Sequence, residues 1–200
     1  MSITPAQVKE LRDRTGAGFM QCKEALAQCG GDTELAVDFL RKKGQSIADK
    51  KALRQVKEGI ITAYIHPPGK LGVLLELNCE TDFVARNESF QELAKNLAMQ
   101  IAAANPSYIS RSDVPAEVIE KERQIYAEQA RSEGKPDKVV EKIVAGRLEK
   151  YYQEHCLLEQ EWVRDPEIRI QDLITQNIAR LGENIVVSRF VRYQVGEKFE

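Results

Sequence analysis

Ile61 to Cys79 reads ITAYIHPPGKLGVLLELNC, a stretch in which apolar residues recur at every second position on either side of a turn. A period of two is typical of β-strands, because successive side chains point to opposite faces of a sheet. The central PPGK has the composition of a tight turn. We therefore predict a β-hairpin whose second strand is mostly buried. The alternating apolar positions are Ile61, Ala63 and Ile65, then Leu71, Val73, Leu75, Leu77 and Cys79.

A second strand signal lies near the C-terminus, where IVVSRFVRYQV at 185–195 is rich in β-branched and aromatic residues. We expect this strand to pair with the hairpin in a three-stranded antiparallel sheet. Between the two strand regions, apolar residues repeat at helical spacing, in the segments 90–101, 116–132, 137–153 and 170–181. The first of these helices can cover the apolar face of the hairpin. Strands and helices in separate groups indicate the α+β class.

Gly134-Lys135-Pro136 joins two of these helical segments. A connection this short is typical of antiparallel neighbours, so 116–153 is predicted to form a helical hairpin. A sheet of three strands leaves edges exposed, and natural proteins usually cover such edges. A second protomer could cover one here.

The first 44 residues predict three short helices separated by glycines, at Gly16, Gly30-Gly31 and Gly44. The first helix begins with a capping box, Thr4 to Gln7, and has proline at its first position. Residues 45–57 have few large apolar side chains and predict an exposed helical linker. The expected domains are therefore a three-helix module at 1–44, the linker at 45–57, and an α+β core at 58–200.

Composition argues against several classes of partner and site. The chain has 29 basic and 31 acidic residues among 200, so no strong net field favours nucleic acid or a membrane. There is no apolar stretch near 20 residues, and the first residues lack the features of a signal or transit peptide, which predicts a cytoplasmic protein. The four cysteines lack the spacing of a metal site, and we expect them to be reduced.

The segment NCETDFVARN, residues 78–87, marks the change from strand to helix. Phe83 is unusual there, because such corners normally carry small polar residues, glycine or proline. One interpretation is a hydrophobic staple that anchors the start of the helix. The other is an exposed aromatic wedge of the kind that forms interface hot spots. The residue pattern alone leaves both open.

The sequence offers little for catalysis. Gly16-Ala17-Gly18 follows a helical segment, not a strand, so we interpret it as a turn and not a phosphate loop. Cys79 falls on the apolar side of its strand, which favours core packing over a nucleophilic role. Glu80 and Asp82 would share one face of an extended chain, about 7 Å apart, and an acid/base hydrolase is the corresponding alternative. We expect a binding protein, not an enzyme, with no cofactor and no metal.

Four segments together resemble the elongation factor Ts family over essentially the whole chain. They are VKELRDRTGAGFMQCKEAL at 8–26, LELNCETDFVARNESF at 75–90, EGKPDKVVEKIVAGRLEKYYQE at 133–154, and GENIVVSRF with RYQVGE at 182–197. Each is long and rich in uncommon residues. The resemblance implies a guanine-nucleotide exchange factor for elongation factor Tu.

The resemblance also implies roles for particular residues. The first module would be a ubiquitin-associated-like three-helix domain, which docks on the nucleotide-binding domain of elongation factor Tu through Arg12, Phe19 and Met20. Phe19 stands where the family often has methionine, and packing of Phe19 or Met20 in the module's own core is the alternative. A second contact is implied near the magnesium and phosphate site of the partner. The residues concerned are Thr81, Asp82, Phe83 and Val84, with Phe83 as the wedge.

This chain has residues for only one of the two sheet-containing subdomains of longer family members, and it resembles the short members that form homodimers. His66 matches in position a histidine of the second subdomain in the longer form, so it would reach elongation factor Tu from the other protomer. The rival function is an adaptor whose ubiquitin-associated-like module binds ubiquitin-like or other peptide ligands.

Overall fold

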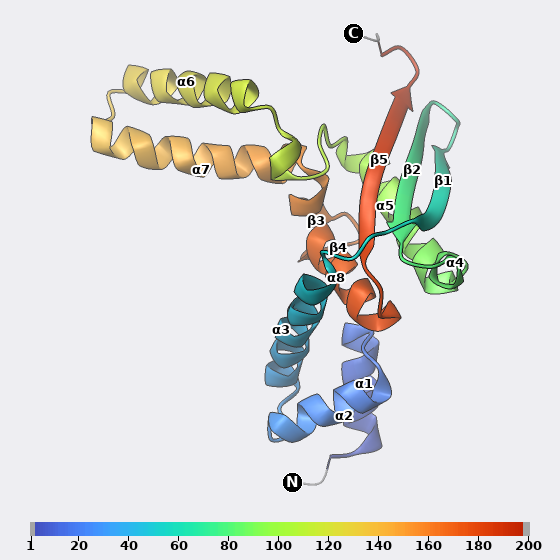
Figure 1. Cartoon of the computed structure of the whole chain (residues 1–200). Coiled ribbons are helices and arrows are strands. Elements are labelled where there is room, and N and C mark those ends of the chain that lie inside the picture. The colour runs from blue at the N-terminus through green and yellow to red at the C-terminus, as the bar shows by residue number, and fades with distance from the viewer. Residues whose placement is uncertain (1–2, 198–200) are drawn as a thin grey trace. The chain divides into compact units, whose positions relative to one another are not determined.

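A computed structural model describes residues 3–197 of the chain. Within that range the protein belongs to the α+β class, as predicted, with eight α-helices and a three-stranded antiparallel sheet (Figure 1). The described residues divide into two compact units. The first consists of 3–64, 74–98 and 172–191, and the second of 65–73, 99–171 and 192–197. No helix in the described part of the chain is long and apolar enough to cross a membrane.

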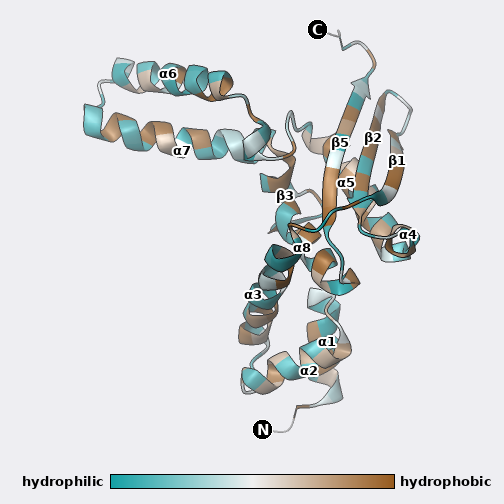
Figure 2. Ribbon diagram, in the orientation of Figure 1, coloured by the Kyte–Doolittle hydropathy of each residue, from teal (hydrophilic) through white to brown (hydrophobic). Residues whose placement is uncertain are grey.

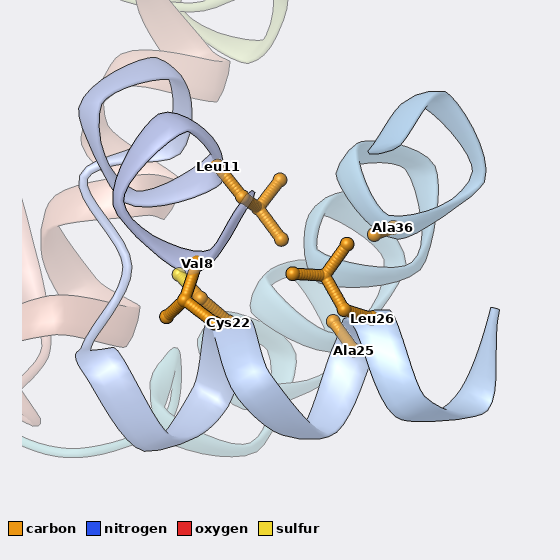
Figure 3. Close-up of a cluster of buried hydrophobic side chains, with 6 residues drawn as sticks. All are labelled: Val8, Leu11, Cys22, Ala25, Leu26 and Ala36. Carbon is orange, nitrogen blue, oxygen red and sulfur yellow. The ribbon is translucent and has the colours of Figure 1, made fainter. Parts of the chain in front are cut away.

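The first unit begins with a bundle of three helices, α1 (Pro5–Thr15), α2 (Phe19–Gln28) and α3 (Thr33–Lys51). The predicted capping box at Thr4 and Gln7 is present, and α1 ends at Gly16, whose φ of 65° is left-handed. Side chains from all three helices point toward one another in a small core (Figure 3). Its buried members are Val8, Leu11, Cys22, Ala25, Leu26 and Ala36.

Helix α3 does not end at Gly44, where the sequence suggested a stop, but continues to Lys51. Gly44 is buried against α8 (Ile170–Leu181), and a Cβ at this position would lie 3.7 Å from the Cβ of Ala179. An ion pair of 2.7 Å between Arg41 and Asp172 joins the same two helices. Burial against α8 thus outweighs the cost of about 1 kcal/mol that a glycine imposes inside a helix. Residues 45–51 belong to α3, while the division at 44 and 57 into domains stays a prediction.

The main sheet has the strand order β1-β2-β5, formed by β1 (Glu58–His66), β2 (Leu71–Cys79) and β5 (Ile185–Gln194). The predicted hairpin and its pairing with the C-terminal strand are therefore confirmed. The central strand β2 is buried at alternate positions, as expected, and Figure 2 shows its hydrophobic character. The buried β2 side chains are Val73, Leu75, Leu77 and Cys79.

Helix α5 (Glu88–Ala104) lies behind the strands in the view of Figure 1. One face of it is fully buried, formed by Phe90, Leu93, Ala94, Leu97, Ala98 and Ile101. At the start of β1, Gly59 comes so close to β2 that a Cβ there would lie 2.3 Å from the carbonyl oxygen of Leu77. Only glycine fits at this point of the hairpin.

The apolar positions of β1 are exposed, unlike those of β2. Ile61 and Ile65 are 70% and 63% exposed, and Ala63 between them is also exposed. β1 is an edge strand, and these side chains lie on the side of the strand that no helix of the described chain buries. The alternation in the sequence is real, but on β1 it does not mark a core face.

In the second unit, α6 (Ala116–Ser132) and α7 (Asp137–His155) form the predicted helical hairpin. Ala130, Val140, Val144 and Leu148 are buried between the two helices. At the base of the hairpin, Arg111 of η1 (Arg111–Asp113) pairs with Glu149 at 2.6 Å and with Glu159 of η2 (Leu157–Glu159). These bonds attach the hairpin to the segments that precede and follow it.

A second, two-stranded antiparallel sheet was not predicted. It consists of β3 (Glu161–Trp162), which has only two residues, and β4 (Asp165–Arg169), whose sequence DPEIR has no alternation of apolar residues. The buried amide of Gln100 supports it, because Nε2 donates to the Glu161 carbonyl at 3.1 Å and Oε1 accepts from the Val163 N–H at 2.9 Å. A buried side chain whose amide both donates and accepts in this way fixes the position of β3, and of the turn that follows it, relative to α5.

Candidate functional site

The segment Thr81–Val84 forms a sharp corner between β2 and the single-turn helix α4 (Asp82–Ala85). Thr81 is the N-cap of α4, because its Oγ1 accepts a hydrogen bond of 3.4 Å from the backbone N–H of Val84. Asp82 is the first helical residue and pairs with Arg86, one turn later, at 3.0 Å. Thr81 therefore has the capping role, and the Asp82 carboxylate remains largely at the surface.

Phe83 is 81% exposed, although it is one of the largest apolar side chains of the protein. A hydrophobic staple would bury the ring, so this interpretation is excluded. Neighbouring Val84 is half-buried and Ala85 is buried, which anchors the other side of the short helix. The corner thus presents an aromatic ring to solvent from a helix whose opposite side is packed.

The corner is tied to the loop between α8 and β5 by the carboxylate of Glu183. Its Oε2 accepts from the backbone N–H groups of Glu80 at 3.1 Å and Thr81 at 3.0 Å. Its Oε1 accepts from the Thr81 hydroxyl at 2.6 Å. In return, the Glu80 carboxylate accepts from the backbone N–H of Asn184 at 2.7 Å. The end of β2 and the start of β5 are therefore joined by reciprocal hydrogen bonds.

The same loop orders a second segment. The Nδ2 of Asn184, a buried residue, donates to the carbonyl oxygens of Arg54 at 2.9 Å and Ala52 at 3.4 Å. Between these two residues stands Leu53, which is 96% exposed. Glu183 and Asn184 thus each hold a segment that carries an exposed apolar side chain. Sequence reasoning missed both residues, since the local signal in Gly182-Glu183-Asn184 is only that of a turn before a strand.

The candidates for catalysis at this corner are occupied by structural interactions. Cys79 is fully buried and its Sγ donates to the Thr81 carbonyl at 3.2 Å. Burial, and to a smaller extent the charge of Glu183, raises the pKa of the Cys79 thiol to about 11, so the thiol is protonated at neutral pH. The Glu80 carboxylate, besides its bond from Asn184, lies 3.4 Å from Arg54. Both side chains are therefore engaged in interactions within the protein.

In the N-terminal bundle, Arg12, Phe19 and Met20 are all exposed. Phe19 and Met20 open α2 and are 50% and 70% exposed, so neither packs in the core of the bundle. The core positions of α2 are taken by Cys22, Ala25 and Leu26. The side chains that the resemblance implies as contacts are therefore at the surface.

His66 is exposed at the end of β1, immediately before the turn. It lies in the second unit, whereas Thr81–Val84 and the N-terminal helices lie in the first. The fold of one chain therefore assembles the corner and the N-terminal helices in one unit but does not include His66 in it.

Comparison with known proteins identifies the family. The family model described as elongation factor TS matches residues 36–197. Elongation factor Ts of Thermodesulfovibrio yellowstonii is 60% identical over 197 residues, covering 98% of this chain and 98% of that protein. Those of Moorella thermoacetica and Fervidobacterium nodosum are 59% and 58% identical, each over 98% of this chain and over 96% and 100% of their own lengths. The chain therefore belongs to the elongation factor Ts family of translation elongation factors.

Proposed function

We propose that this protein binds elongation factor Tu with GDP bound and promotes GDP release by disturbing the magnesium and phosphate site, which allows GTP to rebind during protein synthesis in the cytoplasm. The observation that carries the proposal is the exposed ring of Phe83 on an ordered corner. A large apolar ring held in water has no role in the core of this chain. It suits insertion into another protein.

The mechanism is a difference in binding free energy. A GTPase holds its nucleotide through backbone amides around the phosphates and through a bridging magnesium ion, so displacement of either element weakens the hold. A factor that binds the opened state more tightly than the nucleotide-bound state lowers the affinity for nucleotide. By linkage, nucleotide lowers the affinity for the factor to the same extent. The ternary complex then loses either ligand, and no acid, base or nucleophile is required.

The residues of the corner suit this mechanism. Phe83 has only two side-chain torsions, so little conformational entropy is lost when it is buried in a partner. The Asp82 carboxylate lies next to Phe83 and near the surface. Its negative charge would repel the phosphates and the acidic ligands of the magnesium ion. Arg12, Phe19 and Met20 supply a second anchor on the nucleotide-binding domain. A second anchor would add binding free energy to that gained by the wedge.

The test is the release of a fluorescent GDP analogue from elongation factor Tu at increasing concentrations of this protein. We expect wild type to accelerate release and Phe83→Ala to lower the maximal rate by tens of fold, as truncation of an interface hot spot costs about 2 kcal/mol or more. Val139→Ala, which truncates an exposed apolar side chain of α7, is the matched control and should match wild type. A wild-type rate in Phe83→Ala would refute the wedge.

We also propose that two copies of the chain associate through the outer side of the main sheet. Ile61 and Leu74 are exposed on neighbouring strands, and Ile65 continues the apolar row along β1. An apolar sheet face and an open edge strand are both suited to covering by a second copy. In such a dimer His66, at the end of β1, would reach the elongation factor Tu bound by the other protomer.

A further inference from the structure

The direction of the Phe83 ring depends on a carboxylate outside its own segment. Helix α4 has only four residues, and an isolated turn of this length does not persist in water. Its start is held by one capping oxygen, Thr81 Oγ1, and by the position of the backbone at Glu80 and Thr81. The Glu183 carboxylate accepts hydrogen bonds from the N–H of Glu80 at 3.1 Å, from the N–H of Thr81 at 3.0 Å and from the Thr81 hydroxyl at 2.6 Å.

The bond from the Thr81 hydroxyl has a second consequence. The hydroxyl gives its only proton to Glu183, so its lone pairs remain for the N–H of Val84. Glu183 therefore also sets the orientation in which Thr81 caps α4. Without the carboxylate, two backbone N–H groups and one hydroxyl would lose their partner together. The turn that carries Phe83 would then be free to open.

We propose that Glu183 is a positioning residue for the Phe83 wedge. It acts through Thr81 and α4 and does not itself contact the partner. The inference rests on the proposed exchange function, because it assigns Glu183 to the same contact. In the free protein Glu183 orders the corner in advance, so less entropy is lost on binding. A disordered corner would have to be ordered by the partner at each encounter.

This role predicts a particular kinetic pattern for Glu183→Ala in the nucleotide-release assay. The concentration of exchange factor that gives half the maximal rate should rise about tenfold, which corresponds to about 1.4 kcal/mol. The maximal rate should stay close to wild type, because the bound partner orders the corner at saturation. Phe83→Ala should do the opposite and lower the maximal rate. In a Phe83→Ala background, Glu183→Ala should have little further effect.

Two variants serve as controls. Glu183→Gln should retain most of the wild-type behaviour, since the Gln oxygen can accept from both backbone N–H groups while its amide donates to Thr81 Oγ1. Glu149→Ala removes a carboxylate that accepts two bonds from Arg111 in the other unit, at 2.9 and 2.6 Å. It should leave the kinetics unchanged. The proposal would be overturned if Glu149→Ala raised the concentration for half the maximal rate as much as Glu183→Ala does. It would also be overturned if Glu183→Ala had the same effect in the Phe83→Ala variant as in wild type.

A measurement without the partner separates this inference from the proposed function. Hydrogen exchange at the backbone amides of Glu80 and Thr81 should be at least about tenfold faster in Glu183→Ala than in wild type. Unchanged protection would overturn the positioning role, whatever the nucleotide-release assay gives. Lost protection in Glu183→Ala, together with a wild type that does not accelerate GDP release, would overturn the exchange function alone.

Discussion

At the scale of single residues, the corner between β2 and α4 separates roles that look alike in the sequence. Glu80, Thr81 and Asp82 are consecutive polar residues, and each could cap the helix or face a partner. Only Thr81 accepts from a helix N–H, and only Asp82 keeps its carboxylate near the surface, paired with Arg86. The Glu80 carboxylate accepts from the N–H of Asn184 and pairs with Arg54. Asp82 therefore does not cap α4, although it is the first residue of that helix.

These roles predict different effects on stability. Thr81→Ala should lower the free energy of unfolding by about 1 kcal/mol, the usual cost of losing an N-cap. Asp82→Ala should cost no more than about 0.5 kcal/mol, because an exposed pair one turn apart contributes little. Urea unfolding of both variants beside wild type measures this. If Asp82→Ala is as unstable as Thr81→Ala, the assignment of the cap is wrong.

At the scale of elements, α3 differs most from its prediction. A glycine after a helical segment often marks the end of the helix. Gly44 instead lies inside α3, at the point where α3 packs against α8. The residues that decide this, Thr175 and Ala179, are more than 130 positions away in the chain. No local pattern around Gly44 could reveal them. By contrast, α6 and α7 begin at the predicted residues, Ala116 and Asp137. The two helices are consecutive in the chain and bury their apolar side chains against each other.

The environment of Gly44 predicts that alanine is better there than glycine. A Cβ would lie 3.7 Å from Ala179 and 4.0 Å from Thr175, which is ordinary contact. Gly44→Ala should therefore raise the free energy of unfolding by about 0.5–1 kcal/mol, since alanine loses less backbone entropy in a helix. Gly59→Ala, the contrasting variant, should lower it by about 1–3 kcal/mol because its Cβ meets the Leu77 carbonyl. A destabilised Gly44→Ala would mean that α3 and α8 lie closer than described.

At the scale of the whole molecule, the exposed apolar side of β1 is the feature that one chain leaves unexplained. The sequence signal at Ile61, Ala63 and Ile65 is the same as that of β2, yet the side chains are in water. A period of two reports which side of a strand is apolar. It does not report whether the same chain, or a second one, buries that side.

The proposed association predicts a mass of about twice the 22.6 kDa of one chain in light scattering. Ile61→Lys should shift the protein to the mass of a single chain, because a charge in an apolar interface loses its hydration. The matched control is Val139→Lys on α7, which places the same charge at another exposed apolar position and should keep the wild-type mass. A monomeric wild type, or a dimeric Ile61→Lys, would exclude association through this side of the sheet.

The sequence by itself determined the α+β class, the hairpin, the C-terminal strand, the helical hairpin and the family, because these depend on local periodicity, turn residues and long distinctive motifs. It also located the corner at Thr81–Val84. Only the tertiary structure decided that Phe83 is exposed, that Thr81 is the N-cap of α4, and that Glu183 accepts hydrogen bonds from Glu80 and Thr81. Glu183 is about 100 residues from the corner, and hydrogen bonds between segments that distant exist only once β2 and β5 have paired.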